Sequence, residues 1–330
     1  MRPDVVVDDP DANQEASAPI ACGVRVPQTV RMARADADIL MGVDGTSDME
    51  ALLPKIEAGL LHFGFELLDS DVDARFIIVS EGPPEDADNI CLPPPVGNGD
   101  CVEDDSDPPR YVHVFDASVS GSVLGSIDQT SNYNDYEPFL RDTANMHLVV
   151  VSSDDGVGFF SADDWHQRVL DLDARFRDYR FHAIVPQPGS DCGPSDEFYP
   201  SLVDRTGGIT FDICDDDLTE GFDTLRDAVL SGADSCAWDI PPTLDGPQFE
   251  VGQVNVVVED SVNAPSTVGQ VPLRADCSRA MGGHGWYFDD PVAPTQMLAC
   301  PTTCAALRDA GSTTLSVEFG CATLPADFIQ

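Results

Sequence analysis

Two turns in the sequence concentrate oxygen-bearing side chains directly after short apolar runs, at 38–43 and 148–151. The residues concerned are Asp44, Thr46 and Asp48 after the first run, and Asp154 and Asp155 after the second. Carboxylates and hydroxyls are the ligands that Mg²⁺ and Ca²⁺ take in proteins. In an open α/β sheet, ligands bind beyond the carboxyl ends of the strands, where the strand order reverses. We therefore treat these residues as candidate ligands of one divalent cation.

Both turns also have simpler interpretations. Thr46, Ser47 and Asp48 are residue types that cap helices, and Ser47 followed by Glu50 has the spacing of a capping box. The segment 154–156 (DDG) is typical of a turn. Aspartate often makes such local hydrogen bonds, so spacing alone leaves the cation site and the local interpretations open.

The elements that must position these turns alternate between strand and helix from about residue 36. Strands are expected at the apolar runs 38–43, 74–79, 111–115, 148–151, 180–185 and 209–213, with those at 38–43 and 148–151 buried. Helical spacing of apolar residues falls between them; Ser161 with Asp164 predicts a helix start, and Gly207 predicts the end of a helix near 198–203. Helical crossovers between apolar strands predict an α/β fold with a doubly wound, mostly parallel, Rossmann-like sheet.

The pattern changes towards the C-terminus. Strands are expected at 254–258, 271–274 and 314–319, with a short helix at 303–309. The first twenty or so residues are acidic and have few large apolar groups to offset the entropy of ordering. We therefore divide the chain into three parts: an acidic tail or tether at 1–34, the α/β domain at 35–237, and a smaller β-rich extension at 238–330.

The composition limits the classes of partner. The chain has 17 basic and 59 acidic residues, a formal net charge of −42. Nucleic acids and anionic membranes attract basic proteins, so both are excluded as expected partners. At 42% apolar residues the chain is too hydrophobic to be disordered throughout. We expect a globular protein with an affinity for cations wherever carboxylates converge.

Ten cysteines are more than a cytosolic protein usually carries. They lack the paired CxxC spacing of structural zinc sites, which favours disulfides and an oxidising compartment. The N-terminus shows no apolar signal segment, and no run reaches the ~18 apolar residues of a transmembrane helix. We expect an extracellular or cell-envelope protein whose signal sequence, with a possible lipid tether, lies upstream of this chain.

Residues 37–49 (ADILMGVDGTSDM) resemble the opening of a von Willebrand factor type A (vWA) domain, in which a buried strand ends in D-x-S-x-S before a helix. Further matches follow in the family's order at 148–156 (LVVVSSDDG), 180–185 (RFHAIV) and 206–214 (TGGITFDIC). Together they cover roughly residues 35 to 235. The C-terminal part is similar to the ends of uncharacterised secreted or lipid-anchored bacterial vWA proteins.

The resemblance implies a Rossmann-like sheet with a metal-ion-dependent adhesion site, in which an acidic oxygen of a partner completes the metal shell. It assigns Asp44 to the first aspartate of the motif and Thr46 to the first serine. Asp48 takes the place of the second serine, so a carboxylate replaces a hydroxyl there. Ser120 and Ser122 are weak counterparts of the family's middle threonine. Ser153, Asp154 or Asp155 holds the position of the late aspartate.

The same architecture suggests a disulfide pattern. Cys91 would pair with Cys101 within one loop, and Cys192 with Cys214. Cys22 and Cys236 would tie the two ends of the α/β domain together. The remaining four cysteines would pair within the C-terminal extension: Cys277, Cys300, Cys304 and Cys321.

We therefore expect a secreted or surface-exposed binding protein, not an enzyme, that engages a carboxylate of a protein partner through Mg²⁺ or Ca²⁺. The alternative is a vWA-type structural or assembly module with a non-functional metal site. A hydrolase is the third class considered, because Gly45-Thr46-Ser47 and the His284 loop resemble protease fragments. Their order along the chain is wrong for such enzymes, and the sequence shows no nucleophile–base pair.

Overall fold

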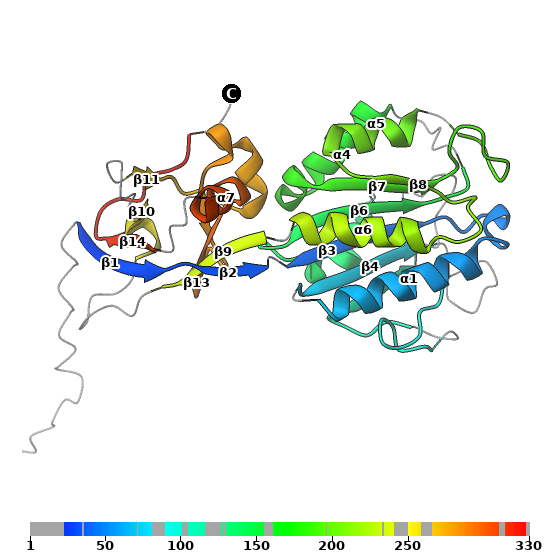
Figure 1. The fold of residues 1–330 in the computed structure, drawn as a ribbon, viewed down its shortest axis with the longest axis horizontal. Helices are drawn as coiled ribbons and strands as arrows, with labels where there is room; N and C mark the ends of the chain where they lie inside the picture. Colours follow the sequence, from blue (N-terminus) through cyan, green and yellow to red (C-terminus); the bar gives the residue numbers. More distant parts are fainter. Residues whose placement is uncertain are drawn as a thin grey trace, which may run out of the picture.

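The chain folds into two lobes that lie end to end along the long axis of the molecule (Figure 1). The computed structural model describes residues 23–34, 36–70, 72–80, 90–100, 105–115, 127, 130–154, 161–195, 197–232, 234–240, 250–258, 266–309 and 314–327. The larger lobe is an α/β unit and the smaller lobe is rich in β structure. Within the described residues, no helix is both long and apolar enough to cross a membrane.

The larger lobe is built on a six-stranded sheet in the order β5-β4-β3-β6-β7-β8, with every pairing parallel. Its strands are β3 (Ala37–Val43), β4 (Ala74–Ser80), β5 (Tyr111–Phe115), β6 (Asn145–Val151), β7 (Arg180–Val185) and β8 (Thr210–Asp212). Counted along the chain, this order is 3-2-1-4-5-6, that of a doubly wound sheet. The predicted α/β fold class is confirmed. Every residue of β3 and β6 is buried, as expected for parallel strands covered on both faces.

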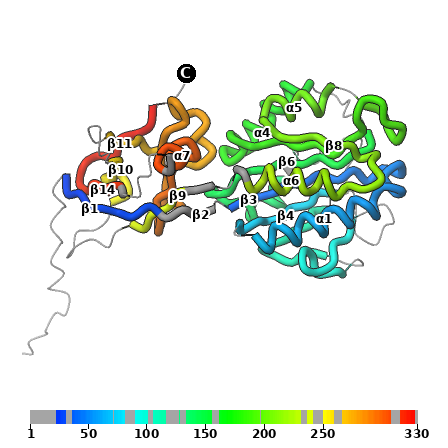
Figure 2. The backbone as a smooth tube through the Cα atoms, in the orientation of Figure 1, coloured from blue at the N-terminus to red at the C-terminus, as the bar shows by residue number. Residues whose placement is uncertain are grey.

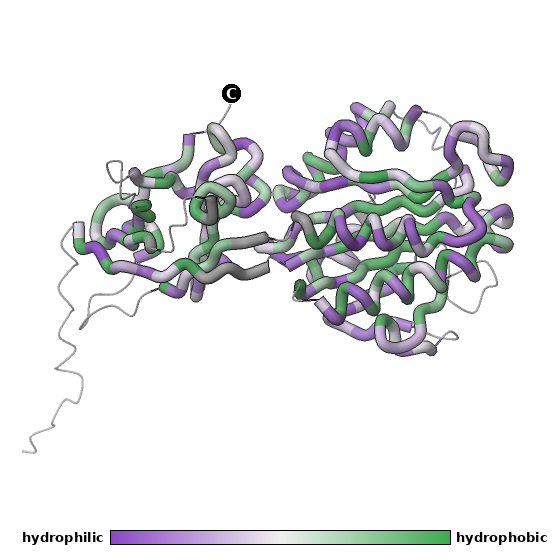
Figure 3. Tube along the Cα trace, viewed as in Figure 1, coloured by the Kyte–Doolittle hydropathy of each residue, from purple (hydrophilic) through white to green (hydrophobic). Residues whose placement is uncertain are grey.

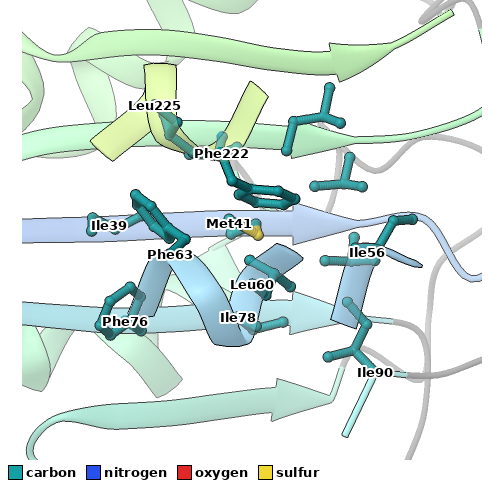
Figure 4. Close-up of a cluster of buried hydrophobic side chains, with 14 of the residues drawn as sticks. Ile39, Met41, Ile56, Leu60, Phe63, Phe76, Ile78, Ile90, Phe222 and Leu225 are labelled. Carbon is teal, nitrogen blue, oxygen red and sulfur yellow. The ribbon is translucent and has the colours of Figure 1, made fainter. Parts of the chain in front are cut away.

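Helices cover both faces of the sheet. On one face lie α1 (Leu53–Leu68) and α6 (Thr219–Gly232), and on the other lie α3 (Thr130–Tyr136), α4 (Ala162–Leu172) and α5 (Phe198–Thr206). Alternate strand residues divide between the two cores, so Ile39 and Met41 face α1 and α6 (Figure 4). The apolar strands therefore lie inside, between helices whose polar residues colour their outer sides (Figure 3).

Two of the three predicted helix boundaries are confirmed. Ser161 and Asp164 form the capping box of α4, and Gly207 ends α5 with a left-handed φ of 68°. The capping box predicted at Ser47 is wrong, because a short 3-10 helix, η1 (Ser47–Met49), intervenes before α1. Helix α1 instead begins with Pro54 in its first turn, where a missing N–H costs no hydrogen bond.

The smaller lobe contains two four-stranded sheets whose pairings are antiparallel, in the orders β1-β14-β10-β11 and β12-β13-β9-β2. Its elements are β1 (Val24–Thr29), β2 (Arg31–Arg34), β9 (Asp234–Asp239), β10 (Val254–Val258), β11 (Ser266–Val268), β12 (Trp286–Phe288), β13 (Gln296–Ala299), α7 (Pro301–Asp309) and β14 (Thr314–Phe319). The predicted strands at 254–258 and 314–319 and the helix near 303–309 are present. The strand predicted at 271–274 is wrong: residues 271–273 form no strand, and a 3-10 helix, η5 (Arg274–Arg279), begins after Leu273.

The chain enters and leaves the larger lobe through two paired strands of the smaller one. Strand β2 pairs with β9, and β1 pairs with β14, so these two N-terminal strands belong to the sheets of the smaller lobe. Figure 2 shows the tube of β1 lying along that lobe. This differs from the tail expected at 1–34, of which only 23–34 are described. Strand β9 also crosses the expected boundary at 237. The reason is that β1 and β2 form backbone hydrogen bonds with β14 and β9, which lie far away in the sequence. The sequence of a strand does not reveal which strand it pairs with.

Three disulfides join described cysteines: Cys192–Cys214, Cys277–Cys300 and Cys236–Cys304. The first agrees with the expected pairing, and the second lies within the extension as expected. The pairing of Cys236 with Cys22 is wrong, because α7 packs against β9 and brings Cys304 to Cys236. Cys91 and Cys321 are also disulfide-bonded. The proposed partner of Cys91, Cys101, lies outside the described residues.

Candidate functional site

The candidate site lies where β3 and β6 end side by side. These strands are neighbours in parallel register, with Val43 opposite Val151. The chain continues from β3 to β4 on one side and from β6 to β7 on the other, so the strand order reverses between them. This is the place where open α/β sheets bind ligands, because the two following loops diverge there.

Asp44 is the central residue of the site. Its backbone N–H donates to the carbonyl of Val151 at 2.9 Å, which fixes the first turn against the end of β6. The carboxylate accepts a hydrogen bond from Thr46 N–H through Oδ1 at 2.9 Å and from the Ser152 hydroxyl through Oδ2 at 2.7 Å. Only 9% of Asp44 is exposed. Each oxygen retains a second lone pair, so the carboxylate can still bind a cation.

The second turn supplies the Ser152 hydroxyl to the site. Ser152 is buried, and its Oγ also accepts the N–H of Asp154 at 3.0 Å. Ser153 is buried as well, and its Oγ has no hydrogen-bond partner among the described residues. Such an orphaned buried hydroxyl calls for an explanation, and an unfilled ligand position is one. Gly193 backs this turn so closely that a Cβ there would lie 2.2 Å from the Ser153 carbonyl oxygen.

The other predicted ligands lie at the edge of this arrangement. Thr46 and Asp48 are exposed on the first turn, and Asp154 is exposed on the second. Asp155, Ser120 and Ser122 lie outside the described residues. The structure thus joins Asp44 directly to Ser152, a residue that the sequence did not single out. Its position immediately after a fully buried strand, beside Ser153, is the pattern that points to it.

The oxygen atoms of these side chains form only a weak binding site for a hard cation. Mg²⁺ and Ca²⁺ take carboxylate, hydroxyl and water oxygens, and the two turns carry such groups in Asp44, Thr46 and Ser153. However, no group of three His, Cys, Asp or Glu side chains suited to a metal occurs within the described parts of the chain. Because affinity rises with the number of charged ligands, a site based on one buried carboxylate binds less tightly than one with several.

Comparisons with known proteins find similarity among solved structures. No protein-family model and no curated protein matches the chain. Among solved structures, it is similar to the crystal structure of the ArnB paralog VWA2 from Sulfolobus acidocaldarius, with 9% sequence identity and a TM-score of 0.31. The match covers 94% of this chain and 65% of that chain, so this chain spans less than two thirds of its neighbour's length. The neighbour is a vWA-domain protein; the α/β assignment here rests on the strand order itself.

Proposed function

We propose that the protein is a vWA-type binding protein of the extracellular space or cell envelope, which holds a divalent cation at the β3–β6 rim. The observation that carries the proposal is the Asp44–Ser152 hydrogen bond between the two turns, with the unpartnered buried hydroxyl of Ser153 next in the chain. The disulfides support an oxidising compartment. Asp44, Thr46 and Ser153 would hold the cation, with Asp48 and Asp154 close enough in sequence to contribute.

The cation would supply the positive charge that the site itself lacks. An acidic group of a protein partner would then complete its coordination shell. With a net charge of −42, the protein repels an acidic partner at long range, so the cation provides the local attraction. Salt screens the long-range repulsion, so association should become faster as ionic strength rises.

Thermal melts test cation binding. In ~0.5 M KCl, which screens the general attraction of a polyanion for cations, Mg²⁺ or Ca²⁺ should raise the Tm relative to EDTA. A cation present at about 100 times its Kd stabilises the native state by about 2.7 kcal/mol. For a domain of this size that corresponds to a rise of roughly 5–10 °C. We expect Asp44→Asn to abolish this rise.

The matched control is Asp204→Asn, which removes the same charge from an exposed position on α5. This variant should retain the full cation-dependent rise. Equal rises in wild type, Asp44→Asn and Asp204→Asn would mean that the cation acts on the overall charge, and the rim site would be rejected.

A structural or assembly module with a non-functional metal site is the second candidate. It is favoured by the absence, among the described residues, of three clustered metal-binding side chains. In that case neither cation should change the Tm of the wild type under the conditions above. The two candidates therefore predict opposite results in one experiment.

A further inference from the structure

A hydrogen-bonded relay of serine, histidine and aspartate lies in the same lobe, separate from the cation site. Ser80 Oγ lies 2.7 Å from His113 Nε2, and His113 Nδ1 lies 2.7 Å from Asp105 Oδ1. The side chains of His113 and Asp105 are fully buried, and Ser80 is 2% exposed. A nucleophile, a base and a carboxylate that orients the base are thus joined in the order that acyl transfer requires.

The sheet brings the first two members together. Ser80 is the last residue of β4, and His113 lies on the neighbouring β5 opposite Ile78. Residues two apart on a strand point to the same face, so Ser80 and His113 are diagonal neighbours. Because β4 is also the neighbour of β3, Ser80 lies at the carboxyl edge of the sheet, where ligands approach.

Asp105 is held so that it can orient the imidazole. Its Oδ2 accepts hydrogen bonds from Leu92 N–H at 2.7 Å and from the Tyr111 hydroxyl at 2.9 Å. Its Oδ1 remains for His113 Nδ1. When Oδ1 accepts the proton of His113 Nδ1, the other ring nitrogen, Nε2, is left to accept the Ser80 proton.

We propose that Ser80, His113 and Asp105 form a catalytic triad that hydrolyses short-chain carboxylic esters. Ser80 Oγ forms a bond to the ester carbonyl carbon while its proton passes to His113 Nε2. The bond to the leaving alkoxide then breaks, and the alkoxide takes that proton and departs as an alcohol. Water attacks the acyl-serine in the same way, releases the carboxylic acid and returns the proton to Ser80. The reaction requires no oxidant and no metal ion.

The surroundings of the relay select small, apolar acyl groups. The Phe115 ring lies 4.4 Å from the His113 ring between centroids, and Tyr111 and Ile90 are buried on the same side of the sheet. A closely packed apolar site admits a short acyl chain more readily than a peptide. Apolar surroundings also strengthen the interaction between Asp105 and the imidazolium that forms during attack.

Covalent labelling tests the proposal. Intact protein incubated with a small fluorophosphonate should gain one adduct, located on Ser80 by peptide mass spectrometry. Hydrolysis of p-nitrophenyl acetate should accompany it. Ser80→Ala should lose both the adduct and the hydrolysis. Asp105→Asn should slow hydrolysis by about 10³–10⁴-fold, because the imidazole is then held in the wrong tautomer.

Ser106→Ala is the matched control, since Ser106 Oγ contacts the backbone N–H of His113 at 2.9 Å but is not part of the relay. It should keep the adduct and the hydrolysis. Circular dichroism checks that each variant folds. If Asp105→Asn does not fold, the comparison of adduct formation and hydrolysis between wild type and Ser80→Ala still tests the triad. Absence of an adduct on Ser80, or ester hydrolysis equal in wild type and Ser80→Ala, would overturn the triad. The proposal does not depend on the cation site, because Asp44→Asn should leave the labelling unchanged.

Discussion

Replacing Arg141 by Met should lower the free energy of unfolding by about 3–5 kcal/mol, because it leaves a buried carboxylate without its counter-charge. Asp38 on β3 is 1% exposed, and its Oδ1 accepts hydrogen bonds from Arg141 Nε and Nη2 at 2.9 and 2.6 Å. The guanidinium also donates to the carbonyls of Ala37 and Asp73. Burial raises the pKa of Asp38 even with Arg141 beside it. Denaturant unfolding at pH 7 measures the loss.

Two comparisons separate this effect from general damage. The double variant Asp38→Leu/Arg141→Met removes both charges and should recover most of the stability, since a buried ion pair contributes little more than apolar packing. Arg205→Met breaks an exposed pair with Asp163 and should cost at most about 1 kcal/mol. If the double variant is as unstable as Arg141→Met, the stranded charge is not the cause.

Acidification from pH 7 to pH 5 should destabilise the protein through a buried histidine pair. His147 on β6 and His182 on β7 stack, with Nδ1 of the first 3.0 Å from Nε2 of the second. Burial, with Arg180 nearby, lowers the pKa of His182 to about 3. Burial, the neighbouring His182 and the charges of Arg180 and Arg274 hold the pKa of His147 well below its usual range.

The direction of this stability change follows from whether the folded or the unfolded state binds protons at the higher pH. In the unfolded chain both histidines gain a proton near pH 6.5, whereas in the folded protein they stay neutral to a much lower pH. Their contribution to stability is therefore complete above about pH 6.5 and is lost as the pH falls towards the folded pKa values. Between pH 7 and pH 5 each histidine accounts for a loss of about 2 kcal/mol.

The variant His147→Gln/His182→Gln should lose about 4 kcal/mol less than wild type over this pH interval, as measured by denaturant unfolding at both values. His62→Gln is the matched control, because His62 is partly exposed beside Asp223. It should leave the pH dependence close to that of wild type. An unchanged pH dependence in the double glutamine variant would mean that the pair takes up protons in the native state as readily as in the unfolded chain.

Local patterns predicted much of the larger lobe. The strands that became β3 and β6 are continuous apolar runs, and only a sheet covered on both faces can bury every residue of such a run. Ser161 and Gly207 marked helix ends through chemistry that acts within a few residues. The prediction at Ser47 failed because residues 47–49 form a 3-10 helix, and α1 begins only at Leu53, with Pro54 in its first turn.

The candidate site was predicted less completely. The sequence indicated Asp44 and the second turn, but not that the Ser152 hydroxyl would bond to Asp44 across 108 residues. Nor did it indicate the relay, because Ser80 and His113 lie 33 residues apart and Asp105 joins them from a loop. Such contacts depend on which strands become neighbours, and strands of similar composition permit several orders.

By itself, then, the sequence determined the acidic, disulfide-bonded character of the protein, the strands and helices of its α/β lobe, and the aspartate that ends β3. The tertiary structure alone decided that β1 pairs with β14 and β2 with β9, that Cys236 bonds to Cys304, and which hydroxyls surround each carboxylate. The physical reason is one of range. Periodicity and capping act over a few residues, whereas strand order and lobe assembly are selected by the burial and hydrogen bonding of the whole chain.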